Sequence, residues 1–283
     1  MKYGVIDIGT NTIRSVVYDE SLKAVKELVF ESKILKFTSN SVLNNEGISD
    51  LCDVIKKSVI FFASENVTAE FAFATSAMRD VSNFDEVKNR IFNDSKIEIE
   101  LLSEKDEALC DFEILKRKSG NPSGAGFDLG GGSCQILTYK NNELEFFTSQ
   151  KIGVKRLLNT FQTLTPENEQ DVREYIKERL LCVPEKSFST IFAMGGTPKK
   201  IQRLILTLFD NEIINRTSLS QLLKAYYSDD ASFKAQSHTE FHKIPYGILI
   251  LDELCTHFSS NNITVTDFGS RDGYLLGKLE YIK

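Results

Sequence analysis

The sequence has no excess of basic residues, no long apolar run and no closely paired cysteines. Its 283 residues include 34 Lys and Arg against 40 Asp and Glu, which gives a formal net charge of −6. Nucleic-acid and membrane-surface binders need a basic face, so this balance argues against nucleic-acid and membrane partners. No stretch approaches the ~20 apolar residues of a membrane-spanning helix. A local basic cleft for a phosphorylated ligand is still compatible with this charge.

Cysteine and histidine are too few and too scattered to indicate a metal site. The five cysteines form no C-x-x-C pair, and the three histidines lie far from most of them in the chain. This pattern argues against structural zinc and is typical of reduced thiols. The first residues also show no apolar signal core before the first strand-like run. We therefore expect a cytoplasmic protein.

Hydrophobic periodicity predicts strands that alternate with amphipathic helices, which indicates the α/β class. A chain of this length suggests two domains. The run at residues 119–124 is rich in Gly, Ser and Pro, and after it the strand, glycine turn and strand of the N-terminus recur. We therefore predict one domain at residues 1–121 and a second at 122–283. The closing helix at residues 271–281 could pack back on the first domain.

Residues 7–12, Asp-Ile-Gly-Thr-Asn-Thr, form a strand end followed by glycine and short polar residues. Such a turn exposes successive backbone N–H groups and hydroxyls, which can form a concave anion site. Glycine has no Cβ, so the backbone can approach a phosphate closely. The alternative is a plain hairpin in which Asp7 caps the turn. The candidate phosphate ligands here are Thr10, Asn11 and, through a guanidinium on the next strand, Arg14.

Residues 128–133, Asp-Leu-Gly-Gly-Gly-Ser, repeat this design in the second half of the chain. Ordering three glycines costs conformational entropy. Two unrelated turns are the alternative, but two hairpins that each begin with an aspartate suggest facing lobes with a polyanion between them. Asp7 and Asp128 would then hold a divalent cation, Mg²⁺ with several retained waters. The candidate phosphate ligands of this turn are Gly131, Gly132 and Ser133.

Three further segments carry candidate phosphate contacts, and each also has an ordinary structural explanation. Arg79 follows a predicted strand and is either a third phosphate contact or a solvated surface residue. Gly196 and Thr197 lie between a strand and a helix, where the helix N-terminus binds an anion or simply follows a turn. Arg271 either contacts a phosphate or belongs to a capped helix start.

In order and spacing, these segments resemble the exopolyphosphatase/guanosine pentaphosphate phosphohydrolase (Ppx/GppA) family, in its short two-domain form. The resemblance covers nearly the whole chain. It implies an α/β fold of two ribonuclease-H-like lobes of the actin, sugar kinase and Hsp70 superfamily, with the ligand in an interlobe cleft. The segments that carry it are the two hairpins, residues 74–79, 103–108 and 195–197, Gly153 and residues 269–273.

The resemblance also implies an activity and roles for single residues. The family releases terminal phosphate from inorganic polyphosphate, or the 5′-phosphate from pppGpp, with Mg²⁺ as cofactor. Glu107 falls on the carboxylate that orients or deprotonates the attacking water, and Arg79 falls on a phosphate-contacting arginine. Guanosine tetraphosphate or pentaphosphate is the alternative ligand to polyphosphate, and many members are homodimers. Phosphoanhydride hydrolysis needs such a base, an in-line water and charge neutralisation.

The chain departs from the family pattern at Gln135, where a catalytic glutamate usually follows the glycine loop. Glutamine can hydrogen-bond a water, but it cannot act as a base or offer a full charge to Mg²⁺. Cys134 also replaces the usual hydroxyl, and Leu109 stands where arginine is common. Two hypotheses follow: a hydrolase with Glu107 and Gln135 at its catalytic positions, or a weakened member that binds polyphosphate or (p)ppGpp. The segments around Arg79 and Glu107 argue against a third hypothesis, an ATP-using kinase.

Overall fold

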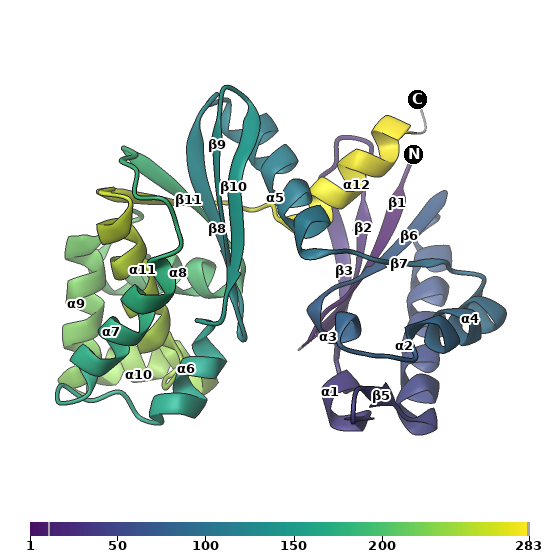
Figure 1. The fold of residues 1–283 in the computed structure, drawn as a ribbon, viewed down its shortest axis with the longest axis horizontal. Helices are drawn as coiled ribbons and strands as arrows, with labels where there is room; N and C mark the ends of the chain where they lie inside the picture. Colours follow the sequence, from purple (N-terminus) through teal and green to yellow (C-terminus); the bar gives the residue numbers. More distant parts are fainter. Residues whose placement is uncertain (11, 282–283) are drawn as a thin grey trace. The chain divides into compact units, whose positions relative to one another are not determined.

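The computed structural model describes residues 1–10 and 12–281, which form two compact units (Figure 1). One unit contains Met1–Cys110 and Ser270–Lys283, and the other contains Asp111–Gly269. The division therefore lies within helix α5 (Glu104–Ser119) and upstream of the boundary predicted between residues 121 and 122. No helix of the described residues is long and apolar enough to cross a membrane.

The first unit is built on a five-stranded mixed sheet with the order β3-β2-β1-β6-β7. Strands β1, β2 and β3 pair antiparallel, whereas β6 and β7 continue parallel to β1. Helices α2 and α4 pack on one face of the sheet, and α12 packs on the other. The bounds are β1 (Tyr3–Ile8), β2 (Thr12–Tyr18), β3 (Ala24–Glu31), α1 (Ile34–Phe37), β4 (Thr38–Ser39), β5 (Val42–Leu43), α2 (Asn45–Ser64), β6 (Ala69–Ala74), α3 (Ser76–Arg79), α4 (Phe84–Ser95), β7 (Ile99–Leu101) and α12 (Ser270–Tyr281).

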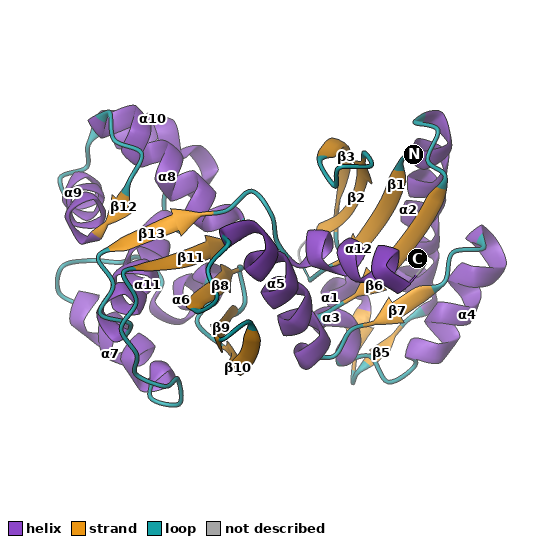
Figure 2. Cartoon of the chain, turned by 90° about the horizontal axis from the view of Figure 1, so that it is seen from above, coloured by secondary structure: helices purple, strands orange, loops and turns teal. Residues whose placement is uncertain are grey.

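The second unit has a six-stranded mixed sheet with the order β10-β9-β8-β11-β13-β12 (Figure 2). Here β8, β9 and β10 pair antiparallel, and β11 and β13 continue parallel to β8. The bounds are β8 (Gly124–Leu129), β9 (Cys134–Lys140), β10 (Glu143–Gln150), α6 (Val154–Phe161), α7 (Glu169–Leu180), β11 (Thr190–Met194), α8 (Gly196–Phe209), β12 (Ile214–Asn215), α9 (Arg216–Tyr227), α10 (Ala231–Ser237), the 3₁₀ helix η1 (His238–Glu240), α11 (Ile244–His257) and β13 (Asn262–Val265).

Both sheets thus use one plan: three antiparallel strands in chain order, with two parallel strands added beside the first. This is the ribonuclease-H-like arrangement, and the predicted α/β fold of two such units is confirmed. The alternation of side chains along the strands explains why both faces are covered. In β1, Val5 packs on one face of the sheet while Ile6 and Ile8 pack on the other.

The packing of α5 explains why the unit boundary lies within this helix. Near its start, the carbonyl of Cys110 lies so close to Gly273 of α12 that a Cβ at position 273 would approach it to 1.9 Å. Farther along, Leu115 contacts Gly126 of β8, and the ring of Phe112 lies 5.6 Å from that of Tyr139. One helix therefore packs on α12 in the first unit and on β8 and β9 in the second.

Two local features have no clear signal in the sequence. Strand β3 ends at Glu31, and a single helical turn, α1, follows it. Helix α10 was not predicted, although Asp230 gives it a defined start by accepting a hydrogen bond from the Phe233 N–H at 2.8 Å. The hairpins predicted at the two glycine turns are both present.

Candidate functional site

The first glycine hairpin lies beside the short helix α3. The Gly9 N–H donates to the Thr12 carbonyl at 3.1 Å and closes the turn between β1 and β2. The Thr10 hydroxyl lies 2.9 Å from the hydroxyl of Ser76, the first residue of α3. This contact connects the hairpin to the helix that carries Arg79. Asn11, a predicted phosphate ligand, lies outside the described residues.

Arg79 ends α3 and bonds the predicted catalytic carboxylate. Its Nη1 donates to the Leu102 carbonyl at 2.8 Å and to Glu107 Oε2 at 3.1 Å. The two side chains are only 18% and 11% exposed, so the pair is largely withdrawn from water. The first unit thus brings together Thr10, Arg79 and Glu107 through α3.

The start of α5 holds Glu107 in place. The Ser103 hydroxyl accepts from the Asp106 N–H at 3.1 Å, and the Ser103 N–H donates to the Asp106 carboxylate at 3.2 Å. This reciprocal arrangement is a capping box in which Ser103 caps the start of the helix. Glu107 follows in the first turn, where the helix dipole favours a negative side chain.

Asp7, a predicted metal ligand, forms an ion pair with Arg271. The Arg271 Nη1 lies 2.9 Å from Asp7 Oδ2, and the two side chains are 29% and 20% exposed. Burial raises the pKa of Asp7, while Arg271 and Arg14 act in the opposite direction. The Arg271 Nε is also buried, and it has no hydrogen-bond partner among the described residues.

Arg14, a third predicted phosphate ligand, bonds a carboxylate of the neighbouring strand. Its Nη1 lies 3.2 Å from Glu27 Oε2, and its side chain is 35% exposed. Exposed pairs of this kind contribute little stability, so a phosphate could displace Glu27 at small cost. The structure thus places Arg14 on the second strand of the first hairpin, opposite Asp7.

The second glycine hairpin is held by its backbone carbonyls. The Gly130 N–H donates to the Ser133 carbonyl at 3.0 Å, which closes the turn. Helix α6 then binds the loop from outside: Val154 N–H donates to the Gly130 carbonyl, and Lys155 and Arg156 N–H both donate to the Gly131 carbonyl, over 2.8–3.2 Å. The loop therefore caps α6, which has no side-chain cap.

These contacts set the direction of the loop N–H groups. In a planar trans peptide the N–H points opposite to the preceding C=O. Because the carbonyls of Gly130 and Gly131 face α6, the N–H groups of Gly131 and Gly132 face away from it. Neither these two N–H groups nor that of Ser133 makes a hydrogen bond within the described part of the chain. Successive free N–H groups form an anion-binding concavity.

Two glycines outside the loop are required by close approach. A Cβ on Gly153 would lie 2.4 Å from backbone atoms of Gly131 and Gly132. Gly195 has a φ of +98°, and a Cβ there would lie 2.5 Å from Asp128 Oδ1. Both positions therefore exclude a side chain, and at Gly195 the Asp128 carboxylate already lies where that side chain would begin.

Gln135 lies directly across the sheet from Asp128. The two residues are partners in the antiparallel register of β8 and β9. Cys134 beside them is fully buried, and burial, followed by the charge of Asp128, raises the pKa of its thiol well above the usual range. This thiol therefore stays protonated and gives Asp128 no second charged neighbour from position 134.

Gly196 and Thr197 form the first turn of α8. No atom would lie within 4 Å of a Cβ at Gly196, so its backbone is open on that side. Thr197 instead packs its methyl group against Gly247 of α11. Of this predicted pair, the structure leaves Gly196 as the more accessible position.

Of the two predicted metal ligands, Asp128 fits a Mg²⁺ site better than Asp7. No cluster of three acidic, histidine or cysteine side chains that could hold a metal exists among the described residues. Mg²⁺ commonly uses only one or two carboxylates, with waters and substrate phosphates as its other ligands. Asp128 fits this pattern as a carboxylate near the end of β8, next to the second glycine turn. Asp7 fits it only in competition with Arg271.

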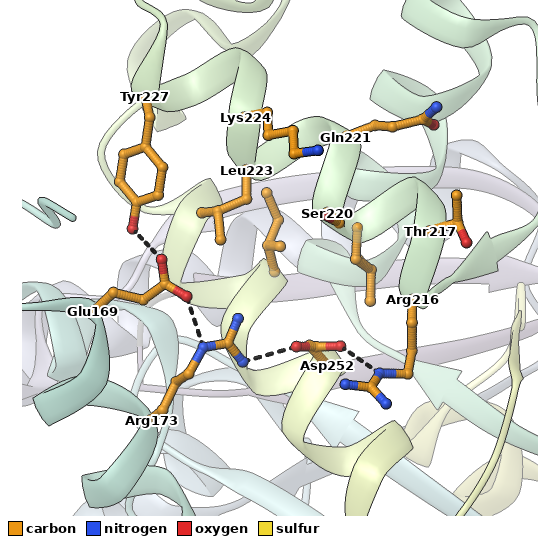
Figure 3. A pocket seen from close by; sticks show the side chains of 12 residues that line it. Glu169, Arg173, Arg216, Thr217, Ser220, Gln221, Leu223, Lys224, Tyr227 and Asp252 are labelled. Carbon is orange, nitrogen blue, oxygen red and sulfur yellow. Dashed lines mark hydrogen bonds and ion pairs between the residues drawn. The ribbon is translucent and has the colours of Figure 1, made fainter.

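A large cavity of the second unit contains none of the predicted site residues. It has a volume of about 720 Å³ and lies among residues of α7, α9 and α11 (Figure 3). Arg173 bonds Glu169 and Asp252 at 2.7 Å each, Tyr227 donates to Glu169 at 2.8 Å, and Arg216 bonds Asp252 at 3.1 Å. These mutually paired charges form an ion-pair network rather than a convergent set of unpaired ligating groups.

Sequence reasoning missed one side chain at the second hairpin. Arg156 of α6 donates from Nε to the Gly132 carbonyl at 3.0 Å. The only signal was its position three residues after Gly153, a residue of the family pattern. A contact to a backbone carbonyl leaves no pattern of residue types that could have revealed it.

The two mixed sheets, each with a glycine hairpin after its first strand, define a protein of the ribonuclease-H-like fold class. The sequence pattern of the Ppx/GppA phosphatase family matches residues 16–282, and the chain belongs to this family. It is 23% identical to exopolyphosphatase 1 of Mycobacterium tuberculosis, over 99% of this chain and 89% of that protein.

Solved structures confirm the fold over the full length. A Ppx/GppA phosphatase from Aquifex aeolicus (type II variant) matches with a TM-score of 0.87 and 21% identity, over 99% of each chain. An exopolyphosphatase from Cytophaga hutchinsonii matches with a TM-score of 0.80 and 20% identity, over 100% of this chain and 99% of the other. The predicted resemblance to the two-domain form of the family is thus confirmed.

Proposed function

We propose that this protein is a Mg²⁺-dependent phosphoanhydride hydrolase that releases terminal phosphate from inorganic polyphosphate or pppGpp-like nucleotides. The observation that carries the proposal is the contact between Glu107 and Arg79, which holds a largely buried carboxylate in one orientation beside a cation. Membership of a phosphatase family and relatives named exopolyphosphatases support it.

In this proposal Glu107 orients the attacking water and accepts its proton. A positioned carboxylate base contributes about 10²–10⁴-fold to a hydrolytic rate. On phosphate binding, the Arg79 guanidinium exchanges part of its contact with Glu107 for a phosphate oxygen, which frees the carboxylate to face the water. Arg79 can make this exchange because its Nη1 retains the hydrogen bond to the Leu102 carbonyl, which keeps the side chain in place.

The glycine hairpins bind the phosphate chain through backbone groups. The N–H groups of Gly131, Gly132 and Ser133 donate to phosphate oxygens, and the Thr10 hydroxyl and the guanidiniums of Arg14 and Arg271 add further donors. Asp7 and Asp128 would hold Mg²⁺. Bound there, the ion would supply charge neutralisation for the transferred phosphoryl group.

The test is phosphate release from polyphosphate and from pppGpp, each with Mg²⁺ and with EDTA. Glu107→Gln serves as the matched control because it keeps the size of the side chain and removes its charge. We expect release by the wild-type protein at least 100-fold above this variant. Equal release by the two proteins, or none by either, would contradict the proposed hydrolase.

Gln135 favours a second candidate function, a sensor that binds polyphosphate or (p)ppGpp without turnover. Gln135 pairs with Asp128 across β8 and β9, so this pair of positions carries one carboxylate. A glutamate at position 135 would give it two. Calorimetry with tripolyphosphate and with ppGpp distinguishes the candidates. Tight binding without phosphate release favours the sensor, and the absence of binding excludes it.

A further inference from the structure

The peptide between Gly132 and Ser133 is held differently from the two before it. Backbone N–H groups of α6 fix the carbonyls of Gly130 and Gly131, and these donors move only if the helix itself moves. The Gly132 carbonyl accepts instead from a side chain, the Nε of Arg156, at 3.0 Å. Within the described residues, this is the bond that anchors the third peptide to α6.

The third peptide can use such an anchor because Gly132 permits a wide range of backbone rotation. Glycine populates positive and negative φ almost equally, so a peptide that follows Gly132 can rotate at little cost. A Cβ at position 132 would meet no atom within 4 Å, so the residue is open on that side, and its backbone packs against Gly153 on another. Rotation of this peptide would turn the Ser133 N–H away from the direction shared by its two neighbours.

We propose that Arg156 is a positioning residue that orients the Ser133 N–H toward the bound anion by holding the Gly132 carbonyl. The inference deepens the proposed function and rests on it, in that the anion is assigned as a phosphate of the substrate. Arg156 acts through the peptide and is not a catalytic residue. Its planar guanidinium suits this role because Nε has a fixed direction, which a lysine ammonium lacks.

The first experiment needs no ligand. Backbone ¹⁵N relaxation is measured for wild type, Arg156→Gln and Arg156→Lys, with Lys151→Gln as a control of equal charge change on an exposed residue between β10 and α6. We expect an order parameter near 0.85 at Ser133 in wild type and the control, and below about 0.6 in both Arg156 variants. Gly131 should stay rigid in all four proteins. An unchanged Ser133 would overturn the proposal.

The second experiment titrates the same proteins with tripolyphosphate and follows the amide shifts of Gly131, Gly132 and Ser133. In Arg156→Gln we expect the Ser133 shift to be lost, the Gly131 shift to persist, and binding to weaken about tenfold, as for one lost hydrogen bond to a charged group. Equal weakening at all three amides, with full rescue by Arg156→Lys, would show that Arg156 acts only by charge. That result would overturn the positioning role.

The two experiments separate this inference from the proposed function. If wild type binds no tripolyphosphate, the proposed function fails, while the relaxation data still decide whether Arg156 orders the loop. If wild type binds and hydrolyses polyphosphate but the Arg156 variants match the Lys151→Gln control in both measurements, only the inference fails. Arg156 is exposed, so its variants are expected to fold.

Discussion

Arg271, at the start of the last helix, forms an ion pair with Asp7, on the first strand, at 2.9 Å. This contact joins the two ends of the chain within one unit. It also means that the carboxylate predicted to bind Mg²⁺ already has a cationic partner. The residue predicted to contact phosphate and the residue predicted to bind the metal thus pair with each other. Each must give up this ion pair to bind its predicted ligand.

Arg271→Gln should destabilise the protein because it leaves the Asp7 carboxylate largely buried and without its cation. Breaking one side of a buried pair costs about 3–5 kcal/mol, and the partial exposure of this pair reduces our expectation to about 1–3 kcal/mol. Urea denaturation measures the change in the free energy of unfolding. The double variant Asp7→Asn/Arg271→Gln should recover part of the loss; additive losses would argue against coupling between the residues.

Glu107→Gln should lower kcat by about 10²–10⁴-fold and leave KM for polyphosphate nearly unchanged. The amide keeps a hydrogen-bond acceptor for Arg79 but cannot take the proton of water. Steady-state phosphate release measures both constants. A rise in KM with kcat intact would instead assign Glu107 to substrate binding.

Gln135→Glu should increase turnover and strengthen the response to Mg²⁺. It places a second carboxylate opposite Asp128 in the register of β8 and β9. Two like charges across an antiparallel pair destabilise the sheet by about 0.2–1 kcal/mol, so the variant should be less stable in EDTA. A bound divalent cation reverses this effect by binding the folded state.

Two measurements check the Gln135→Glu prediction. Phosphate release with increasing Mg²⁺ gives the rate, and thermal unfolding with and without Mg²⁺ gives the stability. We expect a melting temperature that rises with Mg²⁺ more in the variant than in wild type. The same Mg²⁺ response in both proteins would place position 135 outside the metal environment.

The sequence predicts the local parts of the site better than the distant ones. Both hairpins could be predicted because Gly9 and the three glycines of the second turn interrupt otherwise regular strands. The role of Glu107 came only from the family resemblance, since an acidic helix start is common for electrostatic reasons. Its contact with Arg79 depends on the packing of α3 against α5, which no periodicity encodes.

The contacts that sequence reasoning missed share a physical cause. Arg271 and Asp7 are separated by almost the whole chain, and they meet only because α12 packs on the first sheet. Arg156 binds a backbone carbonyl, a partner that every residue offers equally. Such contacts depend on the folded backbone, so no pattern of residue types specifies them.

Gly153→Ala should disrupt the second hairpin because the new Cβ would lie 2.4 Å from backbone atoms of Gly131 and Gly132. Backbone cannot yield as a flexible side chain does, and overpacking of this kind costs about 1–3 kcal/mol. Binding of tripolyphosphate should weaken together with stability. Calorimetry and urea denaturation measure the two effects.

Gly277→Ala provides the opposite control in helix α12. A Cβ there would meet no atom within 4 Å, and alanine favours a helix over glycine by about 0.8–1.0 kcal/mol. We therefore expect this variant to be as stable as wild type or more stable, with unchanged binding. If Gly153→Ala and Gly277→Ala have the same stability and the same affinity for tripolyphosphate, the second hairpin tolerates displacement by α6.

Thiol alkylation should distinguish Cys182 from the buried cysteines. Cys182 is exposed, whereas Cys134 and Cys255 are buried, and burial, followed by the charge of Asp252, raises the pKa of Cys255 to about 12. The thiolate is the reactive form, and at pH 8 a thiol of pKa 12 is ionised to only about one part in 10⁴. Cys182 should therefore react first with iodoacetamide, and Cys255 should react far more slowly in the folded protein.

The raised pKa of Cys255 predicts that the protein loses stability at alkaline pH. Because the pKa of Cys255 is higher in the folded state than the ordinary value of 9, its contribution to stability is full below pH 9 and is lost as the pH rises toward 12. Cys255→Ala should therefore flatten the fall in stability over that range. Mass spectrometry of alkylated peptides and urea denaturation at pH 8 and 10.5 test both statements; early labelling of Cys255 in the folded protein would contradict them.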